Sequence, residues 1–257
     1  MLYWWLDGYV DFTDEQTPNA REHIATFFSW HRKTQLPDYL ALLGRARKEV
    51  LLNATHDQAC AWAEEARVRI NTSLLQLVPS GVDVGRTLSE AQLQHMLKKF
   101  NEVNENLTND FLQPDPEQRR KAALKRAVDR AESFYGSLHR AQRDLIAKGV
   151  EAGPFNPDLW MTERQQRQKD LLAILRALPK MPSQESSTAM VAWVESYQHS
   201  PRPAYLSYQQ KLMQYNCELA TKIHNSTTAA QRLAAADRLK GWEDDLRSLA
   251  TVAALIP

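Results

Sequence analysis

Histidine and cysteine, the side chains that most often perform chemistry, are spaced along this chain without a catalytic or metal-binding signature. None of the seven histidines belongs to an H-E-x-x-H pattern, in which two imidazoles one helical turn apart hold zinc. His56 and Asp57 resemble an acid–base pair, but neighbouring side chains on a helix point about 100° apart. Phosphate-binding glycine loops and the G-x-S-x-G nucleophile motif are absent from the sequence. We therefore expect no catalytic, cofactor-binding or metal-ligating residues.

Cys60 and Cys217 are the two cysteines of the chain, and each lies in a stretch with helical periodicity. Two cysteines do not make the dense disulfide framework of a small secreted domain. One interpretation is that both are small buried hydrophobic residues. The other is a single clamp, which requires an oxidising compartment. Both interpretations stay open at this stage.

Aromatic residues are the stronger indication of a functional surface, since the chain has seven tryptophans and eight tyrosines. Trp4 and Trp5 lie at a terminus where no long helix can bury both, so they either dock into the protein or contact a membrane interface. The candidate interaction residues are Trp4, Trp5, Trp30, His31, Arg32 and Tyr39. The structural alternative is that His31 is packed and hydrogen-bonded beneath aromatic rings and that Arg32 forms an ion pair.

The charge of the chain is balanced, with 32 Lys and Arg against 31 Asp and Glu and a net charge of +1. No global field attracts nucleic acid or an anionic membrane, so we expect no nucleic-acid partner. The basic run 119–130 is interrupted by Asp129 and is expected to be a solvated helix face, as is the acidic run 243–245. The sequence has no apolar run of about 18 residues that would span a membrane. Residues 1–6 lack the basic start and cleavage site of a signal peptide, and Met1 is either native or added.

Helices are the elements that must position these residues. Glycine is scarce, with eight residues, and apolar side chains recur every three or four positions along successive stretches. The pattern predicts helices in 14–34, 56–78, 90–112, 116–148, after 157, in 203–224 and after 228. We predict an all-α fold of about eight to ten antiparallel amphipathic helices. The chain is expected to be one domain, 1–257, with possible sub-bundles 1–149 and 157–257 that share one core.

Five helix starts are predicted from capping boxes. In a capping box, a hydroxyl side chain before the helix accepts from the backbone N–H of the third helical residue, and the glutamine side chain at that third position accepts from the backbone N–H of the capping residue. The five are Thr13–Gln16, Thr55–Gln58, Ser89–Gln92, Thr162–Gln165 and Thr228–Gln231. Their irregular spacing along the chain argues against a regular solenoid.

Three motifs near the N-terminus stand out: Trp4-Trp5-Leu6-Asp7, the helix start at 11–16, and Trp30-His31-Arg32 followed by Leu36-Pro37-Asp38-Tyr39. With the segment 131–138, they resemble a family of uncharacterised proteobacterial predicted lipoproteins. The resemblance covers the first 150 residues well and the last third loosely. It implies a secretory leader and a lipid-bearing cysteine upstream of residue 1, and therefore an address on the periplasmic side of the cell envelope. Without such a leader the address would be cytoplasmic.

Two helix starts, 12–16 and 88–92, are also similar to the L-T-x-x-Q motifs of small periplasmic chaperones of the Spy type. That similarity implies a helical envelope protein that offers a concave, partly apolar surface to other polypeptides.

Three functional hypotheses follow. The first is a non-catalytic envelope protein, tethered to a membrane by an upstream lipid, that binds a macromolecular partner or supports envelope maintenance. The second is a lipid or small-molecule carrier with a cavity between the two halves, lined by Trp193, Tyr205, Tyr208, Met213 and Tyr215. The third is an enzyme of unrecognised type, which would need His31, Arg32 and Asp38 to converge in a cleft.

Overall fold

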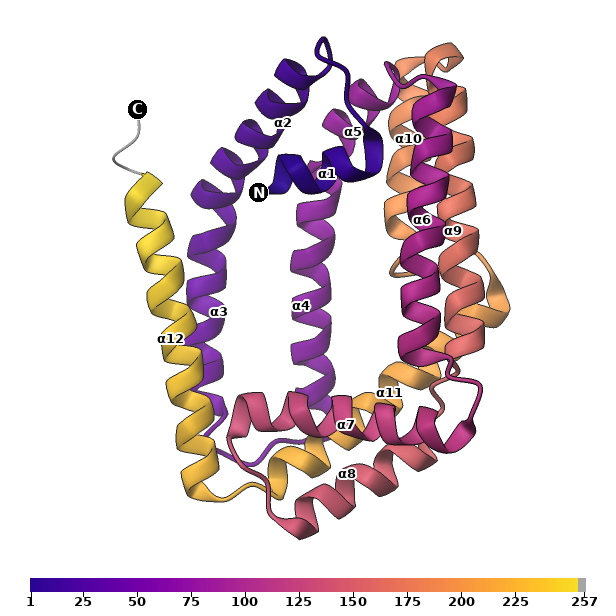
Figure 1. Ribbon diagram of the computed structural model, residues 1–257. Coiled ribbons are helices and arrows are strands. Elements are labelled where there is room, and N and C mark those ends of the chain that lie inside the picture. The colour runs from indigo at the N-terminus through magenta and orange to yellow at the C-terminus, as the bar shows by residue number, and fades with distance from the viewer. Residues whose placement is uncertain (254–257) are drawn as a thin grey trace. The chain divides into compact units, whose positions relative to one another are not determined.

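The computed structural model describes residues 1–253, and within that range the chain is helical and has no strand. The helices are α1 (Leu2–Val10), α2 (Thr17–Trp30), α3 (Leu36–Glu49), α4 (His56–Gln76), α5 (Val78–Gly85), α6 (Glu90–Phe111), α7 (Pro116–Tyr135), α8 (Arg140–Ala152), α9 (Pro157–Ala177), α10 (Ser183–Glu195), α11 (Pro203–Asn225) and α12 (Ala229–Ala253). All but α1 and α5 are at least 13 residues long. The predicted all-α, multi-helix fold is confirmed (Figure 1). No helix within residues 1–253 combines the length and the hydropathy needed to cross a membrane.

The chain divides into two compact units, and each is assembled from three separate stretches. Unit 1 contains residues 1–28, 67–112 and 156–207, and unit 2 contains residues 29–66, 113–155 and 208–257. One division falls at 155/156, within the connection where we expected a boundary, but the units interleave along the chain and do not follow the expected halves 1–149 and 157–257. That the whole chain is one domain stays a prediction.

Unit 1 is built around α9, which packs against α6 and α10 (Figure 1). Its core is formed by apolar residues at helical spacing: Leu93 and Met96 on α6, Leu172 and Leu175 on α9, and Met190 and Val194 on α10. The short helix α5 lies close to the end of α9 because Gly85 has no side chain. A Cβ at Gly85 would lie 2.6 Å from Leu178 Cδ1. Residues 78–85 are helical although they include a proline and two glycines, and this short helix packs against α10 and the turn Leu178–Lys180.

A buried ionic cluster also stabilises unit 1. Glu163 on α9 is 3% exposed and contacts Arg167 at 3.1 Å and Arg202 at 2.5 Å. Burial alone would raise the pKa of Glu163, but its hydrogen bonds from Arg202 and Ser200 outweigh burial and lower it. Glu163 therefore stays ionised with its charge neutralised inside the unit.

Unit 2 is built around the pair α3 and α12, with α7 packed against α12. Ala235 and Ala236 on α12 are buried against Val50, which follows α3, and these small side chains let the two backbones approach. Glu243 is 1% exposed and accepts from Arg47 at 3.0 Å and from Arg247 at 3.2 Å. Our expectation of a solvated acidic face at 243–245 is wrong for Glu243, because two arginines neutralise it in the interface.

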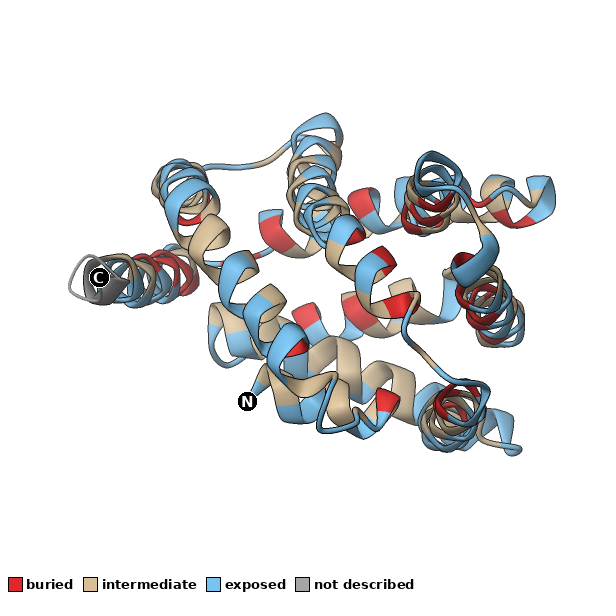
Figure 2. Ribbon diagram, turned by 90° about the horizontal axis from the view of Figure 1, so that it is seen from above, coloured by how far each residue is buried: buried red, intermediate tan, exposed pale blue. Residues whose placement is uncertain are grey.

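Less exposed and more exposed residues alternate along the helices, as amphipathic periodicity requires, although α4 and α7 have no fully buried residue (Figure 2). Four of the five predicted capping boxes are present, at Thr13, Thr55, Ser89 and Thr228. In each, the glutamine Oε1 accepts from the backbone N–H of the capping residue, between 2.8 and 3.1 Å. The boxes at Thr55, Ser89 and Thr228 lie directly before α4, α6 and α12, and the box at Thr13 encloses the turn 14–16 that precedes α2.

In each unit, two capping glutamines form a hydrogen bond with each other and so join two helix starts. In unit 1, Gln92 Nε2 donates to Gln16 Oε1 at 2.7 Å. In unit 2, Gln142 Nε2 donates to Gln231 Oε1 at 2.8 Å. Gln142 is the third residue of α8, and its Oε1 accepts from the backbone N–H of the capping residue His139. The capping glutamines thus fix both where a helix starts and which other helix start it lies beside.

The expected start at Thr162 is wrong. That residue lies inside α9, and its Oγ1 donates to the carbonyl of Asp158 one turn earlier. The helix begins instead at Asn156, whose side chain accepts from the Leu159 amide, with Pro157 in the first position. An asparagine cap followed by proline is a strong start, so the N-cap lies at Asn156, six residues before the predicted Thr162.

The expected long helix 116–148 is also broken in two. Gly136 adopts φ of 76°, a conformation that L side chains rarely take, and ends α7. The apolar stripe continues in α8, so periodicity alone does not reveal the break.

Candidate functional site

The predicted interaction residues Trp30, His31, Arg32 and Tyr39 lie together in unit 2, where α2 passes into α3. The His31 ring lies 5.5 Å from the Tyr39 ring and 6.3 Å from the Trp30 ring, both in edge-on arrangements. Burial and the neighbouring charge of Arg32 lower the pKa of His31. The imidazole is therefore half-buried beside aromatic rings, and whether His31 and Arg32 serve an interaction stays a prediction.

The backbone at this point forms a π-helical turn, His31–Gln35, between two α-helices. Leu36 N–H donates to the His31 carbonyl, one residue beyond α-helical spacing. The cause is Pro37, which has no N–H to offer the carbonyl four residues earlier and whose ring would collide with it. Single π turns are frequent at functional sites, which is consistent with a functional role for Trp30-His31-Arg32.

Trp4 and Trp5 lie on α1 in unit 1 and are 68% and 60% exposed. Trp5 packs 5.0 Å from Tyr9, and Trp4 packs 5.3 Å from Tyr3, each measured between ring centroids. Neither indole is buried, so most of each ring is accessible to a binding partner.

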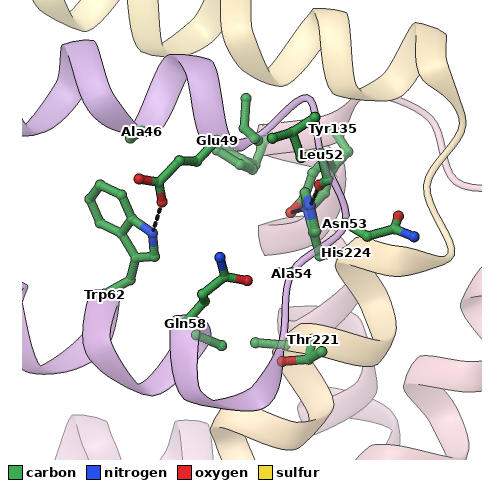
Figure 3. Close-up of a pocket in the computed structure, with 14 residues that line it drawn as sticks. Ala46, Glu49, Leu52, Asn53, Ala54, Gln58, Trp62, Tyr135, Thr221 and His224 are labelled. Atoms are coloured by element: carbon green, nitrogen blue, oxygen red, sulfur yellow. Dashed lines mark hydrogen bonds between the residues drawn. The ribbon is translucent and has the colours of Figure 1, made fainter.

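A pocket of about 320 Å³, partly open to solvent, lies in unit 2, and Figure 3 shows residues that line it. It is formed by the end of α3, the connection 50–55, the start of α4, the end of α7 and α11. Its apolar and aromatic lining includes Val50, Leu52, Trp62, Phe134 and Tyr135. This volume lies at the small end of the range for ligand sites.

His224 forms one wall of the pocket and has a fixed tautomer. Its Nε2 lies 2.6 Å from the Leu52 carbonyl, which only accepts, so this nitrogen donates. Its Nδ1 therefore accepts from the Tyr135 hydroxyl at 2.9 Å. Burial lowers the pKa of His224 and raises the pKa of Tyr135 to about 12. Both groups are held neutral, and both are already hydrogen-bonded.

On the opposite side, the Trp62 indole donates to Glu49 at 2.9 Å (Figure 3). The guanidinium of Arg45 stacks over the Trp62 ring at 4.6 Å and pairs with Glu65. The Gln58 side-chain oxygen accepts from the Thr55 amide, while its amide nitrogen is directed into the pocket (Figure 3). The pocket therefore offers an aromatic and aliphatic wall with an amide donor at one edge, which suits an apolar group that carries a hydrogen-bond acceptor.

Cys60 and Cys217 form a disulfide beside this pocket, with Cα atoms 5.2 Å apart. Ala59 and Ala220, which line the pocket, lie on the same two helices as the cysteines. Of the two interpretations left open by the sequence, the structure supports the clamp. It joins α4 to α11 within unit 2.

Sequence reasoning missed this pocket because five separate segments form it. The residues expected to line a carrier's cavity are divided between the units, with Trp193 and Tyr205 in unit 1 and Tyr208, Met213 and Tyr215 in unit 2. None of them lines the pocket of unit 2. Tyr215 instead donates to the Gly149 carbonyl at 2.6 Å, and Trp193 donates to the Arg167 carbonyl at 2.9 Å.

Comparison with known families gives one match. The model of a family described as a family of unknown function, DUF6279, matches residues 8–198. Neither the comparison with curated proteins nor that with solved structures gives a match.

Proposed function

The chain belongs to the DUF6279 family of unknown function, and we propose from its pocket and its disulfide that it is a non-catalytic binding protein of the cell envelope whose ligand occupies the pocket of unit 2. The ligand class is an apolar or aromatic group with a hydrogen-bond acceptor. Membrane tethering through an upstream lipid belongs to the same proposal.

The observation that carries the proposal is the state of the pocket's polar groups. His224 and Tyr135 bind each other, and Glu49 accepts from Trp62. A histidine used as a general base needs a free lone pair directed at substrate, and both ring nitrogens of His224 are already hydrogen-bonded within the protein. Here the polar groups hold the walls in place, and the surface left to a ligand is mostly apolar.

The envelope address is supported by the disulfide and by the resemblance to predicted lipoproteins. Disulfides persist in oxidising compartments such as the periplasm and are rare in the cytosol. Cys60 and Cys217 are the chain's two cysteines, and both take part in the bond.

The proposal is tested by titrating the oxidised full chain with 1-anilinonaphthalene-8-sulfonate, an aromatic probe with an acceptor group. We expect one saturable site and loss of most of its fluorescence in Ala59→Phe, which fills the pocket. The matched control is Ala173→Phe, at an exposed position of α9 in unit 1. Equal binding by wild type and Ala59→Phe would contradict the proposal.

A second candidate function, docking of a macromolecular partner, is favoured by the exposure of Trp4 and Trp5. Exposed tryptophans are the residues most enriched in interface hot spots. A photo-crosslinking residue at position 4 should give a discrete adduct in cells, and the same residue at position 173 should not. The same pattern of adducts at both positions would remove this candidate.

A further inference from the structure

The disulfide of unit 2 has a histidine beside it. Nε2 of His56 and the two Sγ atoms of Cys60 and Cys217 all lie within 4.8 Å of one another. His56 and Cys60 are one turn apart on α4, and Cys217 comes from α11. Two helices held together at this point therefore present one imidazole and two sulfur atoms to a common centre.

The imidazole is oriented toward the sulfur atoms. Nδ1 of His56 lies 3.2 Å from Oδ1 of Asp57, an acceptor that leaves the proton on Nδ1. Nε2, which then carries the lone pair, lies 3.8 Å from Cys60 Sγ. A carboxylate on one nitrogen and a metal on the other is the usual arrangement around a metal-bound histidine.

These spacings are close to those of a tetrahedral zinc site. Bond lengths of about 2.3 Å to sulfur and about 2.0 Å to nitrogen place neighbouring ligand atoms about 3.6 to 3.8 Å apart. The Cys60–His56 separation of 3.8 Å already meets this requirement. The two sulfur atoms must separate, and Cys217 Sγ, within 4.8 Å of the imidazole, must settle at the same spacing. The cysteine Cα atoms, 5.2 Å apart, allow both adjustments by side-chain rotation.

We propose that His56, Cys60 and Cys217 form a redox-gated metal site, which binds a divalent cation of the zinc type when the disulfide is reduced. A dithiol reductant supplies the two electrons: its thiolate attacks one sulfur and releases the other as a thiolate. Its second thiol then resolves the mixed disulfide, so the reductant leaves as a disulfide and the protein holds two thiols. Binding of the cation displaces both thiol protons, and the two thiolates balance its charge.

The surroundings suit an exchangeable site. Cys217 is buried, while His56 and Cys60 are half-buried, so a cation reaches the site from the His56 side. The three protein ligands leave a fourth tetrahedral position for water. Glu218, next to Cys217 on α11, pairs with Lys222 at 2.6 Å and also interacts electrostatically with His56.

The test uses the full chain, reduced anaerobically with a phosphine and titrated with Co²⁺ and then Zn²⁺. We expect one equivalent of Co²⁺ to give a thiolate-to-cobalt charge-transfer band that one equivalent of Zn²⁺ abolishes. The oxidised chain should give no band. His56→Ala should weaken binding at least about tenfold, because loss even of an outer contact to a metal ligand commonly costs that much.

His199→Ala is the matched control, since His199 is exposed and lies in unit 1. His56→Ala keeps both cysteines, so its oxidised form reports folding by far-ultraviolet circular dichroism. Three results would overturn the proposal: no charge-transfer band in the reduced wild type, equal affinities of wild type and His56→Ala, or loss of helical signal on reduction that Zn²⁺ does not restore. The probe titration of the pocket uses the oxidised chain, so it fails or succeeds independently.

Discussion

Replacing both cysteines, Cys60→Ser with Cys217→Ser, should strongly destabilise unit 2. The disulfide closes a loop with a sequence separation of 157 residues. The loss of chain entropy that such a loop imposes on the unfolded state corresponds to about 5 kcal/mol at 25 °C. The double variant should therefore lose much of the stability that a domain of this size has.

The destabilisation is smaller if the two units unfold separately, because they interleave along the chain. The loop contains residues 67–112 and 156–207 of unit 1. If unit 1 stays folded while unit 2 unfolds, only the roughly 60 loop residues of unit 2 become flexible, and the entropy falls to about 4 kcal/mol. The logarithmic dependence on loop length makes the result insensitive to which unit unfolds first.

The assay is urea unfolding followed by far-ultraviolet circular dichroism. With a slope of about 3 kcal/mol per molar urea, a loss of 4 to 5 kcal/mol lowers the midpoint of unit 2 by about 1.5 M. Reduced wild type should match the double variant, which separates loss of the bond from loss of the sulfur atoms. Midpoints of oxidised and reduced wild type within about 0.3 M of each other would refute the account of the clamp.

Three further perturbations test the charged and polar groups. Because the pKa of His224 is lowered in the folded chain, protonation favours the unfolded chain. The free energy of unfolding should therefore fall as the pH drops from about 7 to about 5. Urea midpoints of His224→Gln should show a weaker dependence on pH. Tyr135→Phe removes the donor to His224 and should cost about 1 to 3 kcal/mol in the same assay; no change would show that this hydrogen bond is not formed. Glu163→Ala leaves the buried Arg167 without its carboxylate, while Arg202 keeps Asp170, and should cost about 3 to 5 kcal/mol; a neutral result would show that the cluster is solvated.

The all-α fold was predictable because its determinants are local. Apolar spacing and the Thr55, Ser89 and Thr228 caps specify helices and their starts within a few residues of sequence. Two local signals compete before α9: Thr162 has the sequence of a cap, but Asn156-Pro157 is the stronger start and begins the helix.

The pocket and the cysteine–histidine cluster were not predictable in the same way. His56 and Cys60 are one turn apart, which is a local signal, but their third partner lies 157 positions from Cys60. The walls at Trp62 and His224 likewise come from α4 and α11. Which distant helices meet depends on packing across a whole unit, and no periodicity within one helix encodes it.

The interaction residues chosen from the sequence lie in different settings. Trp30, His31 and Tyr39 form a contiguous aromatic run because Pro37 forces a π turn between them. Proline was visible in the sequence, but its effect depends on the helix continuing past it, which only the structure shows. Whether the exposed Trp4 and Trp5 bind a partner stays a prediction.

The most direct test of the pocket as the ligand site is nuclear magnetic resonance of the seven tryptophan indoles in the oxidised, ¹⁵N-labelled chain. The Trp62 resonance is assigned by its absence from Trp62→Phe, and the aromatic sulfonate probe is then titrated. We predict that the Trp62 Nε1–H resonance shifts progressively to saturation, while that of Trp160 in unit 1 does not move. An unchanged Trp62 resonance, or equal shifts of all the indoles, would contradict the proposal.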